Sequence, residues 1–158
     1  MAIRNIVKDG DEILHKKCRE VVKFDERLWT LLDDMAETMH DAEGVGLAGN
    51  QVGVLRKVVV IDIGDGVIEL VNPKIIKAEG EQVTAEGCLS FPGEYGLTKR
   101  PMNVTVQAQD RNGNEFTIEG RELLAKAFCH ELDHLEGIIF KEKAIRMLTP
   151  KEIEKLNI

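Results

Sequence analysis

The segment from Arg121 to Glu136 constrains the fold more than any other part of the chain. Its apolar side chains recur at helical spacing, at Leu123, Leu124, Ala127, Phe128, Leu132 and Leu135. They cover so much of the predicted helix that it must be largely buried, and Gly137 is a natural residue for its end. The remaining elements are therefore expected to surround this helix.

The same helix carries the pentapeptide His130-Glu131-Leu132-Asp133-His134. Residues four apart lie on one face of a helix, so the two imidazoles can point at a single object. His-Glu-x-x-His on a helix is typical of a metal site whose Glu acts as base on a bound water. A pair of hydrogen-bonded structural histidines on a half-buried helix is the alternative at this stage.

The remaining elements are read from periodicity and turn residues. A first amphipathic helix is expected behind the N-cap Asp25, ending before Gly44. Alternating and apolar segments predict strands, an irregularity is expected at Asn72-Pro73, and a turn at Phe91-Pro92-Gly93. The predicted strands span 56–63, 68–78, 82–85, 94–100, 104–110 and 115–119, with a hairpin at 111–114 and a short terminal helix from Pro150. We predict one α+β domain over residues 1–158, with mostly antiparallel sheets packed around the central metal-binding helix.

Composition narrows the class of protein. A length of 158 residues suits one domain, and a net charge of −7 argues against nucleic acid as the main partner. Three cysteines do not make a disulfide framework and fit a reducing compartment. The sequence has no apolar run long enough to span a membrane and no signal-peptide pattern at its start, so a cytoplasmic location is expected.

A helical histidine pair needs a third protein ligand. A metzincin would place His at position 140, where this chain has Phe140. A small metalloprotease would use a downstream carboxylate, and Glu152 or Glu154 is available. Cys88 is the remaining candidate, because it follows a glycine in a segment where a strand gives way to a turn. Both Cys88 and the glutamates stay open on these grounds alone.

Three blocks of sequence together resemble the peptide deformylase family, whose members remove the N-formyl group from new proteins. Their order and separation match, and the likeness covers nearly the whole chain. The blocks are Gly44-Val45-Gly46-Leu47-Ala48-Gly49-Asn50-Gln51, Glu86-Gly87-Cys88-Leu89-Ser90 and His130-Glu131-Leu132-Asp133-His134.

The resemblance implies a metal held by Cys88, His130 and His134, with Glu131 as general acid and base. Fe²⁺ is then the expected native ion, and Zn²⁺, Ni²⁺ or Co²⁺ can occupy the same site. The resemblance also implies that the Gln51 side chain and the Leu89 backbone N–H bind the developing oxyanion. The expected partners are N-formylmethionyl nascent peptides, handled by a monomer.

Substrate contacts are expected along exposed backbone. A peptide can lie as an added strand between residues 44–46, which are Gly44, Val45 and Gly46, and the Glu86-Gly87 segment. Val45, Glu86, Leu123 and Ala127 are the candidates for the methionine pocket, with Gln51 and Leu89 close to the scissile bond.

Two features depart from the family pattern. Gly49 stands where the family usually has Ala, which would loosen the backbone before Gln51. The tail after Phe140 is short, which leaves open whether the chain contacts the ribosome surface. Asp133 is expected to be structural and to form a buried ion pair with Arg100.

Overall fold

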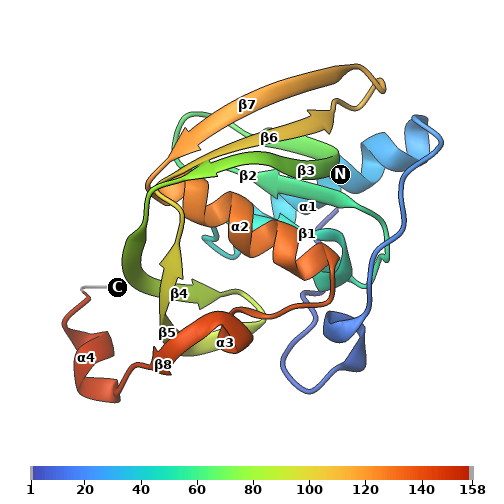
Figure 1. The fold of residues 1–158 in the computed structure, drawn as a ribbon. Coiled ribbons are helices and arrows are strands. Elements are labelled where there is room, and N and C mark those ends of the chain that lie inside the picture. The colour runs from blue at the N-terminus through green and yellow to red at the C-terminus, as the bar shows by residue number, and fades with distance from the viewer. Residues whose placement is uncertain (1, 157–158) are drawn as a thin grey trace.

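The computed structural model describes residues 2–156 and has the α+β architecture that the sequence predicts. Helix α2 (Leu123–Leu135) lies between two antiparallel sheets, as Figure 1 shows. The larger sheet has the order β1-β2-β3-β6-β7, and the smaller sheet has the order β4-β5-β8. The larger sheet consists of β1 (Gly46–Ala48), β2 (Val58–Ile61), β3 (Ile68–Glu79), β6 (Asn103–Gln109) and β7 (Glu115–Arg121). The smaller consists of β4 (Gln82–Cys88), β5 (Phe91–Arg100) and β8 (Ala144–Met147).

Strand β2 is buried on both faces, which explains its uninterrupted apolar sequence. Helix α1 (Glu26–Asp41) covers one face of the larger sheet, and α2 covers the other. Val58 and Val60 belong to the cluster formed with α1, whereas Val59 and Ile61 belong to the cluster formed with α2. The larger sheet therefore contributes to two hydrophobic cores, and one of its faces packs against α2.

Helix α1 begins at the predicted cap and ends before Gly44, but its left-handed residue is not the glycine. The Asp25 side chain caps it by accepting a hydrogen bond from the Leu28 N–H. The left-handed residue at the other end is Glu43, with φ of 56°, and not Gly44. The N–H groups of Glu43 and Gly44 donate to the carbonyls of His40 and Met39, which is a Schellman motif. The helix thus ends before Gly44, as predicted, and the left-handed position is one residue earlier than a terminating glycine would place it.

The hairpin of β4 and β5 also differs from the prediction. Its turn lies at Leu89-Ser90, and Phe91-Pro92-Gly93 already belongs to β5. Phe91 is buried against Phe140, with ring centroids 5.6 Å apart, and this contact draws the segment into the sheet. The expected irregularity at Asn72-Pro73 is confirmed as a register shift between Val71 and Lys74.

The short elements complete the chain. They are the 3₁₀ helices η1 (Glu12–His15) and η2 (Gly49–Val52) and the helices α3 (Phe140–Lys143) and α4 (Pro150–Glu154). The Schellman motif at Gly137 ends α2 as predicted, with Gly137 N–H donating to His134 and Ile138 N–H to Asp133. Among residues 2–156, no helix combines the length and the apolar character needed to cross a membrane.

Candidate metal centre

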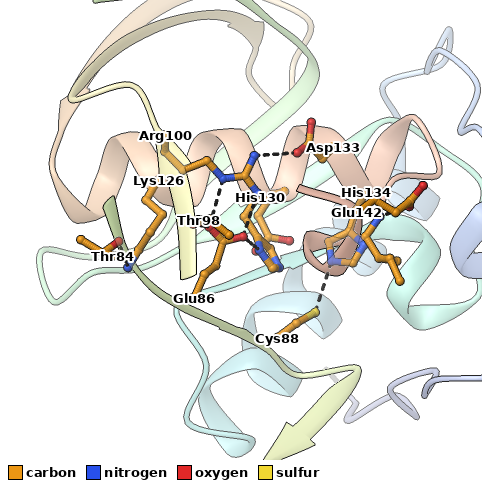
Figure 2. A network of polar contacts seen from close by, with 12 residues as sticks. Thr84, Glu86, Cys88, Thr98, Arg100, Lys126, His130, Asp133, His134 and Glu142 are labelled. Atoms are coloured by element: carbon orange, nitrogen blue, oxygen red, sulfur yellow. Dashed lines mark hydrogen bonds and ion pairs between the residues drawn. The ribbon is translucent and has the colours of Figure 1, made fainter. Parts of the chain in front are cut away.

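Three potential metal ligands meet where the end of β4 faces α2. Cys88 Sγ lies 3.3 Å from His134 Nε2, and the ligand atoms of Cys88, His130 and His134 all lie within 4.8 Å of one another. Figure 2 shows Cys88 pointing from β4 toward the two histidines on α2. One thiolate and two imidazoles form a donor set that suits Zn²⁺, Fe²⁺ and similar divalent ions. The three side chains therefore fit a metal, with room for a further ligand.

The glutamates considered as alternative ligands lie elsewhere. Glu152 is on α4, where its two carboxylate oxygens accept hydrogen bonds of 2.8 and 2.7 Å from Arg146. Glu154 is exposed on the same short helix, which lies apart from α2 in Figure 1. Phe140, the residue that replaces a metzincin ligand, packs beside His130 with ring centroids 6.0 Å apart.

A buried ionic network contacts the Nδ1 side of the His130 ring. Its Nδ1 lies 2.6 Å from Glu86 Oε2, and Glu86 also accepts hydrogen bonds from Thr98 Oγ1 and from Nε and Nη2 of Arg100. Burial alone would raise the pKa of Glu86, but the hydrogen bonds from His130 and Arg100 outweigh burial and hold it well below its usual range. Glu86 therefore stays ionised and orients His130 with Nε2 toward Cys88 and Glu131.

The expected pair of Arg100 and Asp133 is present, with Arg100 Nη1 donating to Asp133 Oδ2 at 2.8 Å (Figure 2). Arg100 thus bridges the two acidic side chains. The Glu86 side chain is only 3% exposed, and both of its carboxylate oxygens already have partners. Sequence reasoning placed Glu86 in the substrate pocket and missed its contact with His130, which depends on the pairing of β4 with β5.

His134 is in the form that binds a metal. The ring is fully buried at the end of α2, and burial holds its pKa well below the ordinary value. It is therefore neutral, with Nε2 facing Cys88 Sγ. By contrast, the pKa of Cys129, the neighbour of His130 in sequence, is raised to about 11 by burial. Cys129 is thus an inert thiol within the core cluster beneath α2.

The carboxylate of Glu131 lies beside the three ligands. Its Oε2 is 4.0 Å from His130 Nε2, and its Oε1 is buried without a hydrogen-bond partner among the described residues. Burial raises the pKa of Glu131 to about 7. A carboxyl group of this kind can both accept and return a proton near neutral pH.

Glycines bring the segment before η2 against this carboxylate. A Cβ added at Gly46 would lie 2.6 Å from Glu131 Oε2, and one added at Gly44 would lie 2.5 Å from Leu89 Cδ1. Gly49 meets a different neighbour, because its Cβ would lie 2.6 Å from the Arg56 carbonyl oxygen. A side chain at Gly49 would require the main chain to shift, whereas one at Gly44 or Gly46 would displace the side chain of Leu89 or Glu131.

Gln51 is buried and lies next to Cys88. Its Oε1 accepts a hydrogen bond from the Ala48 N–H at 3.0 Å, and its Nε2 lies 3.4 Å from Cys88 Sγ and 3.1 Å from Ser90 Oγ. The amide is therefore held with its N–H groups toward Cys88. Leu89 comes after Cys88, in the turn between β4 and β5.

A cavity of about 430 Å³ opens in front of these groups. Its lining includes all the residues that the sequence predicts for substrate binding except Gln51. Lys126 and Tyr95 also line it and were not predicted. Lys126 Nζ donates to Thr84 Oγ1 and the Ala85 carbonyl, and the Tyr95 ring covers Gly87 (Figure 2 shows the Lys126 contact). The predicted lining residues found here are Gly44, Val45, Gly46, Glu86, Gly87, Leu89, Leu123 and Ala127.

Known proteins have sequences related to this one over most of the chain. The family model described as polypeptide deformylase matches residues 3–149. The peptide deformylase of Acetivibrio thermocellus is 59% identical over 155 residues, which cover 98% of this chain and 91% of that protein. The peptide deformylase of Thermoanaerobacter pseudethanolicus is 55% identical over 157 residues, covering 99% of each chain.

Solved structures agree with these sequence matches. The crystal structure of a peptide deformylase from Thermotoga maritima has a TM-score of 0.89 and 35% identity, covering 91% of this chain and 99% of that one. The structure of the Synechococcus elongatus peptide deformylase in complex with actinonin has a TM-score of 0.87 and 34% identity, covering 96% of this chain and 82% of that one.

Proposed function

This chain belongs to the polypeptide deformylase family, hydrolases that remove the formyl group from an N-terminal methionine, and we propose which of its residues carry out that reaction. Cys88, His130 and His134 hold one divalent metal, and Glu131 acts as general acid and base. The observation that supports this assignment is that the ligand atoms of Cys88, His130 and His134 lie within 4.8 Å of one another, and that Cys88, His130 and Glu131 line one cavity.

The metal is proposed to be Fe²⁺, with Zn²⁺, Ni²⁺ or Co²⁺ able to replace it, because the donor set accepts each of these ions. When bound, such an ion makes water a nucleophile at neutral pH and polarises the formyl carbonyl. Glu86 keeps the His130 ring oriented for this task through the 2.6 Å contact with Nδ1.

Glu131 transfers the proton in this reaction. Its carboxylate takes a proton from the attacking water and gives it to the amine that leaves when the C–N bond breaks. Its raised pKa, about 7, suits both steps at neutral pH. Gln51 Nε2 and the Leu89 N–H donate hydrogen bonds to the oxyanion that forms from the formyl oxygen. Donors of this kind lower the barrier by about 3 kcal/mol each.

The substrate is proposed to be the formylmethionyl end of a nascent peptide, lying as an extended strand between β1 and β4. Both are edge strands of their sheets, so each offers main-chain groups to a peptide. Val45, Leu123 and Ala127 line the pocket for the methionine side chain, together with Gly44, Gly46 and Gly87 along the backbone. Action as a monomer in the cytoplasm, near the ribosome surface, belongs to the same proposal.

Paired cysteine variants test the ligand assignment. Cys88→Ser and the control Cys129→Ser are purified without oxygen, and the metal content and the release of formate from a formyl-Met peptide are measured. We expect Cys88→Ser to lose the metal and the activity, whereas Cys129→Ser keeps both. A Cys88→Ser protein with one tightly bound metal would contradict the assignment and favour a glutamate ligand.

Glu131→Gln tests catalysis separately from binding. This variant should keep the metal and lose turnover by at least ~10²-fold, as expected for a general acid and base. Wild-type turnover in Glu131→Gln would remove this residue from the mechanism.

A further inference from the structure

Asn50 lies in η2 and is fully buried against the end of α2. Its side-chain Nδ2 donates a hydrogen bond of 2.5 Å to the backbone carbonyl of His134, a residue 84 positions away in the chain. Its backbone N–H contacts the buried thiol of Cys18. Both the backbone N–H and the side-chain amide of Asn50 thus donate hydrogen bonds. The side-chain bond ties Asn50 to His134, one ligand of the proposed metal site.

Asn50 and His134 each have one buried side-chain polar atom without a hydrogen-bond partner among the described residues. These atoms are Asn50 Oδ1, which is an acceptor, and His134 Nδ1. His134 Nε2 faces Cys88 Sγ at 3.3 Å, so Nε2 is the atom that would bind the metal. A neutral imidazole that uses Nε2 as a ligand carries its proton on Nδ1, and that N–H needs an acceptor.

The other histidine ligand shows what such an acceptor does. His130 Nδ1 contacts Glu86, which fixes the tautomer and the direction of the ring. His134 has no carboxylate at its Nδ1 among the residues that the structure describes. Leaving a buried N–H without a partner costs about 1–3 kcal/mol, so a complementary acceptor on an adjacent side chain is significant.

We propose that Asn50 is a positioning residue for His134, an inference that rests on the proposed metal site. Its Nδ2 anchors the His134 carbonyl, and its Oδ1 accepts the Nδ1 proton, either after a small rotation or through one buried water. The amide is neutral, so it orients the ring without adding charge to a site that already contains Cys88, Glu86 and Glu131. His130 and His134 would then be oriented by a carboxylate and an amide, respectively.

The test uses the full chain loaded with Zn²⁺. The Zn²⁺ dissociation constant is measured by competition with a chelator for wild type, Asn50→Leu, Asn50→Asp and the control Asn72→Ala. Asn72 is a suitable control because its side chain also bridges backbone and side-chain groups, at Val21 and Gln109, on the larger sheet. Histidine ring tautomers are determined by ¹H–¹⁵N NMR of the same proteins.

We expect wild-type His134 to show a slowly exchanging Nδ1–H. Asn50→Leu should weaken Zn²⁺ binding by about 10- to 100-fold and speed exchange of that proton. Asn50→Asp keeps an acceptor for Nδ1–H but loses the donor to the His134 carbonyl, so it should weaken Zn²⁺ binding less than Asn50→Leu does. Asn72→Ala should lose thermal stability but keep both metal affinity and the Nδ1–H signal.

Several outcomes would overturn the inference. A wild-type His134 without a proton on Nδ1 would exclude it even if Asn50→Leu did not fold. Equal losses of affinity in Asn50→Leu and Asn50→Asp would assign the effect to the lost donor alone. If wild type failed to bind Zn²⁺ through Cys88, the proposed metal site itself would fail, whereas normal binding in Asn50→Leu would reject only the role of Asn50.

Discussion

Replacing Arg100 by Met removes the positive charge from the buried network behind His130. Arg100 is 6% exposed and donates two hydrogen bonds to Glu86 and one to Asp133. Met fills a similar volume but leaves the Glu86 carboxylate buried without its guanidinium. Removing one partner of a buried ion pair costs about 3–5 kcal/mol. That is a large part of the roughly 5–15 kcal/mol that stabilises a domain.

Asp133→Asn provides the matched comparison. The Asp133 side chain is 23% exposed, and an amide oxygen can still accept a hydrogen bond from Arg100. We expect this variant to lose only about 1 kcal/mol, because the ion pair is replaced by a hydrogen bond from the guanidinium to a neutral amide. The contrast between the two variants separates the buried contact with Glu86 from the partly exposed contact with Asp133.

The pH dependence provides a second measurement. The folded-state pKa of Glu86 lies well below the ordinary value, so the network stabilises the protein above about pH 4 and this contribution is lost as the pH falls further. In Arg100→Met, burial raises the Glu86 pKa with less opposition. The stability difference between wild type and Arg100→Met should therefore shrink as the pH falls through the Glu86 pKa of the variant, which lies above that of the wild type.

Urea unfolding monitored by circular dichroism, from about pH 3 to about pH 8, measures these differences. A loss in Arg100→Met no larger than that in Asp133→Asn would refute the reasoning. So would a difference from wild type that stays constant or grows toward acid pH.

Three further predictions concern the site and its metal. Gln51→Ala should lower kcat by about 10²- to 10³-fold with little change in KM, because an oxyanion donor is lost; a normal kcat for formate release would exclude that role. Gly49→Ala should destabilise the fold by about 1–3 kcal/mol in urea unfolding, because its Cβ would lie 2.6 Å from the Arg56 carbonyl oxygen, and unchanged stability would show that the backbone adjusts freely. Removing the metal with a chelator should abolish formate release, with Fe²⁺ restoring it only in the absence of oxygen because a thiolate-bound ferrous site is open to oxidation; recovery in air would count against iron as the native ion.

The long elements could be predicted from the sequence because local patterns determine them. The periodicity of α1 and α2, the cap at Asp25 and the glycine at Gly137 are all readable within one or two turns of helix. Strands β1 and β8 and helix α3 have only three or four residues and little pattern of their own. They form because longer neighbouring strands provide partners for them.

The site was predictable only in part, for a similar reason. The positions of His130, Glu131 and His134 are set by helical spacing alone. The contacts of Glu86 with His130 and of Asn50 with His134 join residues 44 and 84 positions apart, which no local pattern reveals. The contact of Gly44 with Leu89, from the turn between β4 and β5, is likewise not readable from any local pattern.

The separation of β1 and β4 into two sheets has a consequence for the range of proteins that this chain can process. The cavity lies between two sheet edges, and an extended peptide placed there would join them through its main chain. Main-chain pairing is the same for almost every sequence, so only the first side chain, in the apolar pocket, would be selected. If substrates bind in this way, the site would suit a catalyst whose substrates share their first residue and differ in the sequence that follows it.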